Sequence, residues 1–210
     1  MLELFFKINA HYRLSFKVGC YALLRLIVFP TRWMLGSIAL KGRVLCLGCG
    51  YGVLETLIAE EYPEARLLGM DTDEKRIKVA NESIHGLSNI SFQVGDALKL
   101  GTNESFDAIV ALDIIHHLPR ESQESVLRGL WAMIQPGGEL VLKDLKTEPK
   151  WKTDWAYFHD LIVAGRPINY RSVEFYENIF KSLGAEISIS YPTDFYLPYN
   201  HFLLIARKSN

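Results

Sequence analysis

The stretch VLCLGCGYG, residues 44–52, decides how the rest of the chain is interpreted. It begins as a short apolar run and ends with three glycines at alternating positions. Glycine has no Cβ atom, so such a run permits a tight turn and lets a ligand lie against the backbone. The same stretch contains Cys46 and Cys49, which have the spacing of a redox pair. A redox pair usually has its first cysteine at a helix N-terminus, whereas we expect Cys46 inside a strand and Cys49 lies between two glycines, so the glycines are the functional feature.

The segments that follow Gly42 alternate between β-rich runs and runs of helical periodicity. This alternation is typical of a parallel sheet with helices on both faces. The predicted fold class is therefore α/β, a doubly wound Rossmann-like sheet in which the glycines form the first turn from a strand into a helix. We expect strands at 43–47, 66–70, 90–94, within 106–119, and at 139–143, 187–191 and 201–207.

Capping residues and helical spacing predict the helices between these strands. Asp73 and Ser172 are each expected to cap the N-terminus of a helix. Pro119 is expected in the first turn of another helix, whose buried stripe extends to Ile134. The stretch 144–171 is less regular, but it contains four large apolar residues at helical spacing, namely Trp151, Trp155, Phe158 and Ile162.

Composition limits the compartment and the partners. A chain of 210 residues, 49% of them hydrophobic, can bury a full core. Three cysteines are too few for a disulfide framework, which predicts a reducing, cytoplasmic location. Residues 1–50 carry seven Lys or Arg against one Glu, so the remainder carries a net charge of −7. This distribution argues against a nucleic-acid partner, whose recognition needs a basic domain surface.

Residues 1–41 form a basic and apolar segment, which we expect to be a helical appendage to a domain spanning 42–210. Its apolar run at 18–30 is interrupted by an arginine and is shorter than the roughly 20 apolar residues that a membrane span needs. A signal-peptide cleavage site does not follow it. Two roles stay open: a lid packed on the domain, or peripheral contact with an anionic membrane through a helix edged by Lys17, Arg25 and Arg32.

Glycine spacing and two acids indicate the type of cofactor. A dinucleotide fingerprint has the spacing G-x-G-x-x-G/A, whereas here the third glycine comes one residue early and Val53 takes the last position. Asp71 follows the second expected strand about 20 residues after the glycines, where a carboxylate accepts ribose hydroxyls. Asp96 follows the third, where a carboxylate can accept hydrogen bonds from adenine. Either acid alone could be a cap or turn residue, but together they favour a nucleoside.

These motifs, in this order, resemble those of class I S-adenosylmethionine-dependent methyltransferases. The family's first four motifs correspond to VLCLGCGYG, GMDTD, GDAL and FDAIVALDIIHHLP, and the motif before its fifth strand corresponds to IQPGGELVL. The resemblance extends from Gly42 to the end of the chain. It implies a seven-stranded sheet with an antiparallel last strand, and S-adenosylmethionine as the methyl donor.

The resemblance also implies roles for individual residues. Asp71 would bind the ribose, Asp96 with Ala97 the adenine, and Asp113 the amino group of the cofactor or the substrate. The chain departs from the family at Cys46, where an Asp or Glu is usual. The other expected cofactor-binding residues belong to the glycine stretch or follow the ribose acid, and they are Gly48, Cys49, Gly50, Gly52 and Thr72.

Methyl transfer is an in-line displacement at the sulfonium methyl, in which the protein mainly supplies alignment. We expect no metal. A nucleophile of high pKa needs a base, and an imidazole, which titrates near pH 6.5, suits that role. His117 is the favoured base and His116 the second candidate, although both could be loop residues bonded to backbone. Candidates of lower rank are Asp144, His159, Tyr170 and Arg171.

The expected acceptor is a small hydrophobic molecule that resembles a quinone, polyketide, polyene or lipid. Substrate choice in the family usually lies in the N-terminal segment and after the fifth strand, and both regions are apolar and aromatic here. For the individual residues, core packing is the simpler explanation. Two other classes stay open: a non-catalytic S-adenosylmethionine-binding protein that docks on a partner or membrane, and an NAD(P)-dependent oxidoreductase. The acceptor atom and the oligomeric state are open as well.

Overall fold

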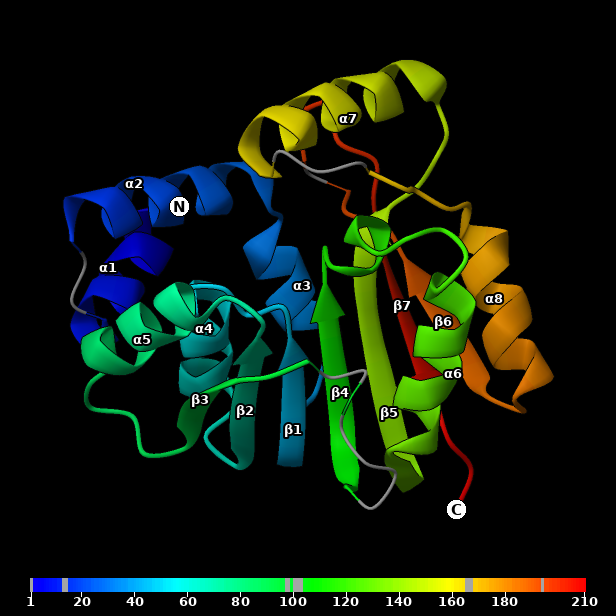
Figure 1. Ribbon diagram of the computed structural model, residues 1–210, viewed down its shortest axis with the longest axis horizontal. Coiled ribbons are helices and arrows are strands. Elements are labelled where there is room, and N and C mark those ends of the chain that lie inside the picture. Colours follow the sequence, from blue (N-terminus) through cyan, green and yellow to red (C-terminus); the bar gives the residue numbers. More distant parts are fainter. Residues whose placement is uncertain (1, 13–14, 97–98, 100–103, 165–167, 194) are drawn as a thin grey trace. The chain divides into compact units, whose positions relative to one another are not determined.

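The computed structural model describes residues 2–12, 15–96, 99, 104–164, 168–193 and 195–210 (Figure 1). Its strands form a seven-stranded sheet in the order β3-β2-β1-β4-β5-β7-β6. Strand β7 runs antiparallel to both of its neighbours, β5 and β6. The predicted fold class is therefore confirmed, including the antiparallel last strand.

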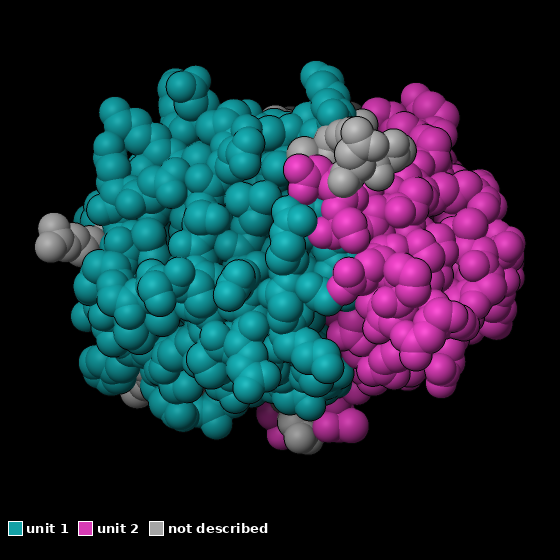
Figure 2. Space-filling model, turned by 90° about the horizontal axis from the view of Figure 1, so that it is seen from below, with its two compact units in different colours: residues 1–101, 106–109 teal, residues 102–105, 110–210 magenta. Residues whose placement is uncertain are grey.

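The chain divides into two compact units, which Figure 2 shows in different colours. Unit 1 comprises residues 1–101 and 106–109, and unit 2 comprises residues 102–105 and 110–210. Strand β4 (Phe106–Leu112) contributes residues to both. The expected division into an appendage at 1–41 and a domain at 42–210 stays a prediction.

Unit 1 contains the first three strands and the helices that connect them. Strands β1 (Gly42–Leu47), β2 (Ala65–Asp71) and β3 (Ile90–Val94) pair in parallel. Helix α4 (Val53–Glu61) and helix α5 (Glu74–Ser83) connect them and pack against β2 and β3. These five elements lie where the alternating pattern predicts them.

The register of these strands brings the residues after them to one edge of the sheet. Leu47 at the end of β1 pairs with Met70, and Asp71 at the end of β2 pairs with Val94. The carboxyl ends of the three strands are therefore level. The glycine stretch, Asp71 and Asp96 all follow these ends, as a ligand site in a doubly wound fold requires.

Helix α5 starts at the expected cap. The carboxylate of Asp73 accepts hydrogen bonds from the backbone N–H groups of Lys75, at 3.0 Å, and Arg76, at 3.1 Å. These bonds satisfy donors that have no partner within the first helical turn. Ile77 and Ala80 face inward and pack with Phe92 of β3.

Three N-terminal helices belong to unit 1: α1 (Leu2–His11), α2 (Phe16–Val28) and α3 (Thr31–Ser37). The hydroxyl of Tyr12 donates to the carbonyl of Tyr51 at 2.6 Å, and α1 and α3 both contact α4. The segment therefore packs on its own unit. Within the described residues, no single helix is both long and apolar enough to cross a membrane, and α2 with α3 meets these criteria only as a pair bent by 68°.

Unit 2 contains the rest of the sheet. Strands β5 (Ile134–Leu145) and β6 (Glu186–Ser190) both pair with β7 (His201–Arg207). Helix α6 (Gln123–Ala132) packs on β5, and helix α8 (Val173–Ser182) packs on β6 and on α6. All side chains of β7 except the last are buried, so this strand forms the centre of the unit's core.

Two expectations around α6 are wrong. Pro119 is not in the helix, because it lies in a turn whose carbonyl accepts the N–H of Ser122, the residue before the first helical position. Ile134 is not in the helix either, because β5 begins there rather than at 139. Gly137 has φ +76°, and a glycine of this kind in the sequence indicates a turn rather than a strand. Its N–H nevertheless donates to the carbonyl of Lys208 at 3.0 Å, which keeps this segment paired.

The stretch after β5 is more regular than expected, and its large residues are not core. Helix α7 (Lys150–Ala164) occupies most of it. Its inward face carries Ala156, which packs with Leu145 and Tyr170. Core packing is therefore the wrong explanation for the four residues at helical spacing, because all four are exposed to solvent: Trp151, Trp155, Phe158 and Ile162.

Helix α4 contains a buried acid among apolar neighbours. The Glu55 side chain lies in the first turn of the helix and the residue is only 5% exposed. Burial raises the pKa of its carboxyl from 4.5 to about 7, against the opposing effects of a backbone hydrogen bond and of the Arg25 charge. The unfolded chain therefore binds fewer protons than the folded chain between these two values, and stability falls as pH rises through this range.

We predict that Glu55→Gln raises the free energy of unfolding at about pH 8 by up to about 3 kcal/mol more than at about pH 5. The amide keeps the shape of the side chain and removes the buried charge. Urea denaturation at the two pH values measures the difference. Glu64→Gln, which changes an exposed acid of the same unit, is the control, and its effect on the free energy of unfolding should be the same at both pH values. An equal effect of Glu55→Gln at both pH values would contradict the assignment.

Candidate functional site

The glycine stretch forms a turn that only glycine adopts readily. Gly48, Gly50 and Gly52 have φ values of +64°, +54° and +73°, in the left-handed region that residues with a Cβ atom avoid. At Gly52 a Cβ atom would also lie 2.2 Å from the ring of Phe92. The turn therefore reverses the chain tightly between β1 and α4.

Asp71 connects this turn to the neighbouring strand. Its Oδ2 atom accepts the N–H of Gly50 at 2.8 Å, and its Oδ1 atom accepts the N–H of Asp73 at 2.9 Å. The side chain is only partly buried, and each carboxylate oxygen has a second lone pair. Asp71 can therefore hold the turn and still accept the two hydroxyls of a ribose.

The backbone N–H groups of the turn are used within unit 1. Those of Gly48 and Cys49 donate to the carbonyl of Met70, and that of Gly52 donates to the carbonyl of Cys49. A pyrophosphate-binding turn instead directs such groups at the ligand. This turn therefore fits a neutral nucleoside with a small attached chain better than it fits a dinucleotide.

Gly50 packs against side chains of its own unit. An added Cβ atom would meet only the side chains of Arg76 and Tyr21, at 3.7 to 3.9 Å. Both side chains lie with the aromatic ring of Tyr51: Arg76 stacks over it at 5.5 Å, and Tyr21 meets its edge at 5.1 Å. These contacts place a cation and two aromatic rings beside the turn.

The other expected cofactor-binding residues are divided between the two units. Asp96 is half-buried after β3, and the N–H of Gly95 beside it donates to the backbone carbonyl of Asp71 at 3.0 Å. Thr72 is exposed next to Asp71. Ala97 lies outside the described residues. Asp113 belongs to unit 2.

The two cysteines of the glycine stretch are buried thiols. Burial raises the pKa of Cys46 and of Cys49, and the charge of Glu55 acts in the same direction on both. The thiolate is the reactive form of cysteine, so these environments oppose redox or nucleophilic chemistry. They also identify Glu55 as an acid near the turn, which the sequence reasoning missed. The available signal was a lone acid in the apolar first turn of the helix.

In unit 2, a buried ion pair follows β4. The Nζ atom of Lys143 donates to Oδ1 of Asp113 at 2.6 Å, and the lysine side chain is fully buried. Asp113 has φ +53°, which is uncommon for a residue with a side chain. Such strain occurs most often where a side chain must be held at a functional site.

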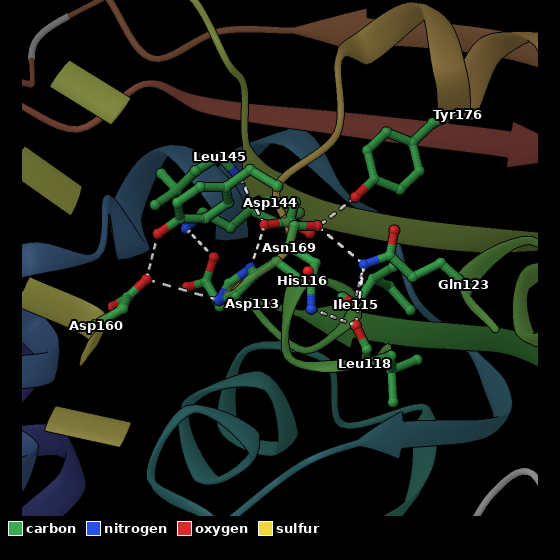
Figure 3. A network of polar contacts seen from close by, with 12 residues as sticks. Asp113, Ile115, His116, Leu118, Gln123, Asp144, Leu145, Asp160, Asn169 and Tyr176 are labelled. Carbon is green, nitrogen blue, oxygen red and sulfur yellow. Dashed lines mark hydrogen bonds and ion pairs between the residues drawn. The ribbon is translucent and has the colours of Figure 1, made fainter. Parts of the chain in front are cut away.

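His116 belongs to a second buried network, drawn in Figure 3. Its Nδ1 atom lies 2.5 Å from Oδ1 of Asp144, and the Tyr176 hydroxyl donates to the other oxygen of this carboxylate at 3.1 Å. The N–H of Leu145 donates to Oδ1 at 2.8 Å. Burial alone would lower the pKa of His116, but the adjacent Asp144 carboxylate, with smaller contributions from Asp113 and Asp160, outweighs burial and the pKa is raised.

The second ring nitrogen of His116 faces helix α7. Its Nε2 atom lies 3.7 Å from Oδ2 of Asp160, and the same carboxylate accepts a hydrogen bond from the hydroxyl of Tyr170. The Tyr170 ring packs on the imidazole with a centroid distance of 5.0 Å. Because Nδ1 is held by Asp144, a proton exchanged with a substrate would enter or leave at Nε2.

His117 is in a different electrostatic state. Burial, followed by the charge of its neighbour His116, lowers its pKa to about 4. The two rings lie 4.2 Å apart, and Nδ1 of His117 is buried with no hydrogen-bond partner among the described residues. His117 is therefore neutral near pH 7 and weakly basic.

The lower-ranked candidates have identifiable contacts. Asp144 belongs to the His116 network, and Tyr170 lies against it. Arg171 donates to the side chain of Gln123 and to the carbonyl of Arg120, so it braces the loop before α6. The ring of His159 packs edge-on against Tyr199 at 5.7 Å.

Three side chains of unit 2 lie close enough together to hold a metal ion, as judged by distance alone. Ligand atoms of Asp113, His116 and Asp144 are all within 4.8 Å of one another. However, Asp113 is bonded to the ammonium of Lys143, and His116 to Asp144. A divalent ion would compete with both contacts. Ion pairing within the unit accounts for the arrangement.

Comparison with known proteins adds sequence relatives. The family model "Methyltransferase domain" matches residues 44–138. A ubiquinone biosynthesis O-methyltransferase of Pseudomonas fluorescens (strain SBW25) is 32% identical over 124 residues, which are 56% of this chain and 51% of the relative. One from Bordetella avium is 30% identical over 118 residues, 53% of this chain and 46% of the relative. The chain spans about half the length of the curated relatives it matches.

Solved structures show the same fold. Human N-acetylserotonin methyltransferase in complex with S-adenosylmethionine has a TM-score of 0.71 at 18% identity, over 90% of this chain and 54% of that protein. An S-adenosylmethionine-dependent methyltransferase of Archaeoglobus fulgidus has a TM-score of 0.69 at 15% identity, over 88% and 94% of the two chains. Residues 44–138 therefore match the methyltransferase-domain family, and the sheet order and the solved structures show that the chain has the fold of the S-adenosylmethionine-dependent methyltransferases.

Proposed function

We propose that this chain transfers a methyl group from S-adenosylmethionine to an oxygen of a small hydrophobic acceptor. The observation that carries the proposal is the turn at 48–52, whose amides bond within unit 1 while Asp71 keeps acceptor capacity for a ribose. The bound cofactor supplies an electrophilic methyl group. The remaining steps are binding, alignment and proton removal, which belong to the residues of this chain.

The cofactor contacts follow from unit 1. Asp71 would accept the ribose hydroxyls, Asp96 the adenine amino group, and the Gly50 end of the turn, beside Arg76 and Tyr51, would receive the methionine chain. Glu55, whose pKa burial raises to about 7, would supply an acid near the turn, where the family usually has an acid at the position of Cys46. Its electrostatic effect on both buried thiols supports this role.

The geometry supports His116 more strongly than His117 as the base. Asp144 holds Nδ1 of His116 and raises its pKa, which makes Nε2 the stronger proton acceptor. A base whose pKa is about 4 takes up a phenol proton far less readily. His116 is only 1% exposed, so an acceptor reaches Nε2 only when the side chains of Asp160 or Tyr170 give way.

The acceptor class is inferred from the relatives and from unit 2. The similar Pseudomonas and Bordetella proteins are O-methyltransferases of ubiquinone biosynthesis by name. His116 lies against the rings of His117 and Tyr170, and such a flat, ring-lined environment suits a phenolic or quinone-like acceptor. The direct test incubates the protein with S-adenosylmethionine and polyprenylated or simple catechols, and analyses the products by mass spectrometry. A mass increase of one methylene supports the proposal, and the absence of any methylated product with bound cofactor favours a non-catalytic binding protein.

Asp71→Ala should weaken binding of S-adenosylhomocysteine by roughly tenfold to 100-fold, because hydrogen bonds to a charged group contribute roughly 1.5–3 kcal/mol. Isothermal titration calorimetry measures the dissociation constant. Glu74→Gln, which changes an exposed acid at the start of α5, is the matched control and should leave it unchanged. Equal affinities of wild type and Asp71→Ala would remove Asp71 from the cofactor site.

The base assignment predicts a change in the pH profile. His116→Ala should lower kcat by roughly 10² to 10⁴. Asp144→Asn should lower the pKa of His116, because the carboxylate charge that raises it is lost, so the acid limb of the kcat profile should move to lower pH. His117→Ala should retain the wild-type profile. If His117→Ala loses kcat and Asp144→Asn leaves the pH profile of kcat unshifted, His117 is the base instead.

A further inference from the structure

Helix α7 exposes an apolar stripe that the proposed reaction does not use. The stripe consists of Trp151, Trp155, Phe158 and Ile162, spaced four, three and four residues apart on one side of the helix. Each is between 53% and 67% exposed. A helix at a protein surface normally turns its apolar side inward, so this orientation needs an explanation.

Contacts on the opposite side hold the helix in this orientation. Ala156 is buried against Leu145, and Asp160 accepts a hydrogen bond from Tyr170. The hydroxyl of Thr153 donates to the carbonyl of Lys146 at 3.1 Å. Because these contacts come from three successive turns of α7, the stripe cannot turn inward without breaking them.

The size of the stripe favours a lipid surface over a second copy of the chain. These four side chains, with the less exposed Tyr157 and Leu161 of the same helix, present on the order of 650 Å² of largely apolar surface. Apolar patches of a few hundred Å² mark interaction sites, whereas a stable dimer buries roughly 800 Å² on each partner. A bilayer needs no complementary patch, and tryptophan favours its interface.

The charges of α7 indicate which kind of membrane binding to expect. The helix carries two lysines and two aspartates, so its formal charge is zero. Lys150 pairs with Asp154 at 2.6 Å, and Lys152 lies 5.5 Å from the ring of Trp151. Attraction to anionic lipid is therefore small, and apolar burial would supply the binding energy.

We propose that the α7 stripe docks on the surface of a lipid bilayer, with Trp151 and Trp155 at the level of the headgroups. Docking does not depend on the proposed methyl transfer. If that function holds, docking brings α7, whose Asp160 faces His116, to the bilayer surface, and a lipid-like acceptor would come from that surface.

Membrane binding through helix α2 would depend on lipid charge and salt in a different way from binding through α7. Helix α2 also exposes apolar residues, Phe16, Leu23, Leu24 and Ile27, but these lie in the basic N-terminal segment. Contact through α2 would need anionic lipid and would weaken with salt. Contact through α7 should occur on zwitterionic phosphatidylcholine and persist in high salt.

The test is flotation of the full chain with phosphatidylcholine vesicles, combined with tryptophan fluorescence. We expect co-flotation at low and high salt and a blue shift of the emission. Phe158→Ser/Ile162→Ser should lower vesicle affinity at least about tenfold and reduce the blue shift, since two apolar side chains no longer enter the interface. Both substituted residues are exposed, and circular dichroism verifies that the variant is folded.

Phe6→Ser/Phe16→Ser is the matched control, because it removes two exposed aromatic residues from unit 1. It should float like the wild type. The proposal is overturned if the wild type stays unbound to phosphatidylcholine, or if the control loses binding while Phe158→Ser/Ile162→Ser keeps it. Reversible dimerisation in sedimentation velocity that Phe158→Ser/Ile162→Ser abolishes, without vesicle binding, would assign the stripe to a second copy.

Discussion

The carboxylate of Asp71 is the constraint on which the edge of unit 1 at the carboxyl ends of its strands depends. One oxygen holds the N–H of Gly50 in the turn after β1, and the other holds the N–H of Asp73, the cap of α5. Its backbone carbonyl accepts the N–H of Gly95 at the end of β3. A single residue thus joins three neighbouring strand ends and remains able to accept ribose hydroxyls. Binding residues held in this way lose little conformational entropy when a ligand arrives.

In unit 2, buried charged groups are paired around His116. Lys143 forms an ion pair with Asp113. The Asp144 carboxylate raises the pKa of His116, and the second oxygen of Asp144 accepts a hydrogen bond from Tyr176. Buried polar groups are costly unless their hydrogen bonds are made. The network therefore fixes the imidazole orientation and makes it a better proton acceptor than the adjacent His117.

The sequence predicted the parts of the fold that rest on local chemistry. The strands and the Asp73 cap follow from periodicity and capping, and the glycine turn follows from backbone freedom. The start of β5 was missed because the pairing that retains Gly137 in the sheet comes from residues about 70 positions later. The four residues of the α7 stripe were assigned to the core because spacing reveals a helix but not which side of it is covered.

The candidate site was predictable to a similar degree. Motif order points to Asp71 and both histidines as candidates, and it predicts the methyltransferase fold that the structure shows. The choice between the histidines depends on Asp144, which is 28 residues away and meets His116 only in the folded chain. Glu55 was missed because an acid near a helix N-terminus is ordinarily an exposed dipole partner, and only packing shows that this one is buried.

The central claim is that the turn at 48–52 is built for a nucleoside with an attached amino acid and not for a dinucleotide. Calorimetric titration of the wild-type chain with S-adenosylhomocysteine and, separately, with NADH tests it directly. The account predicts saturable binding of S-adenosylhomocysteine at one site per chain and no heat of binding for NADH. Saturable binding of NADH, or a folded protein that fails to bind S-adenosylhomocysteine, would contradict it.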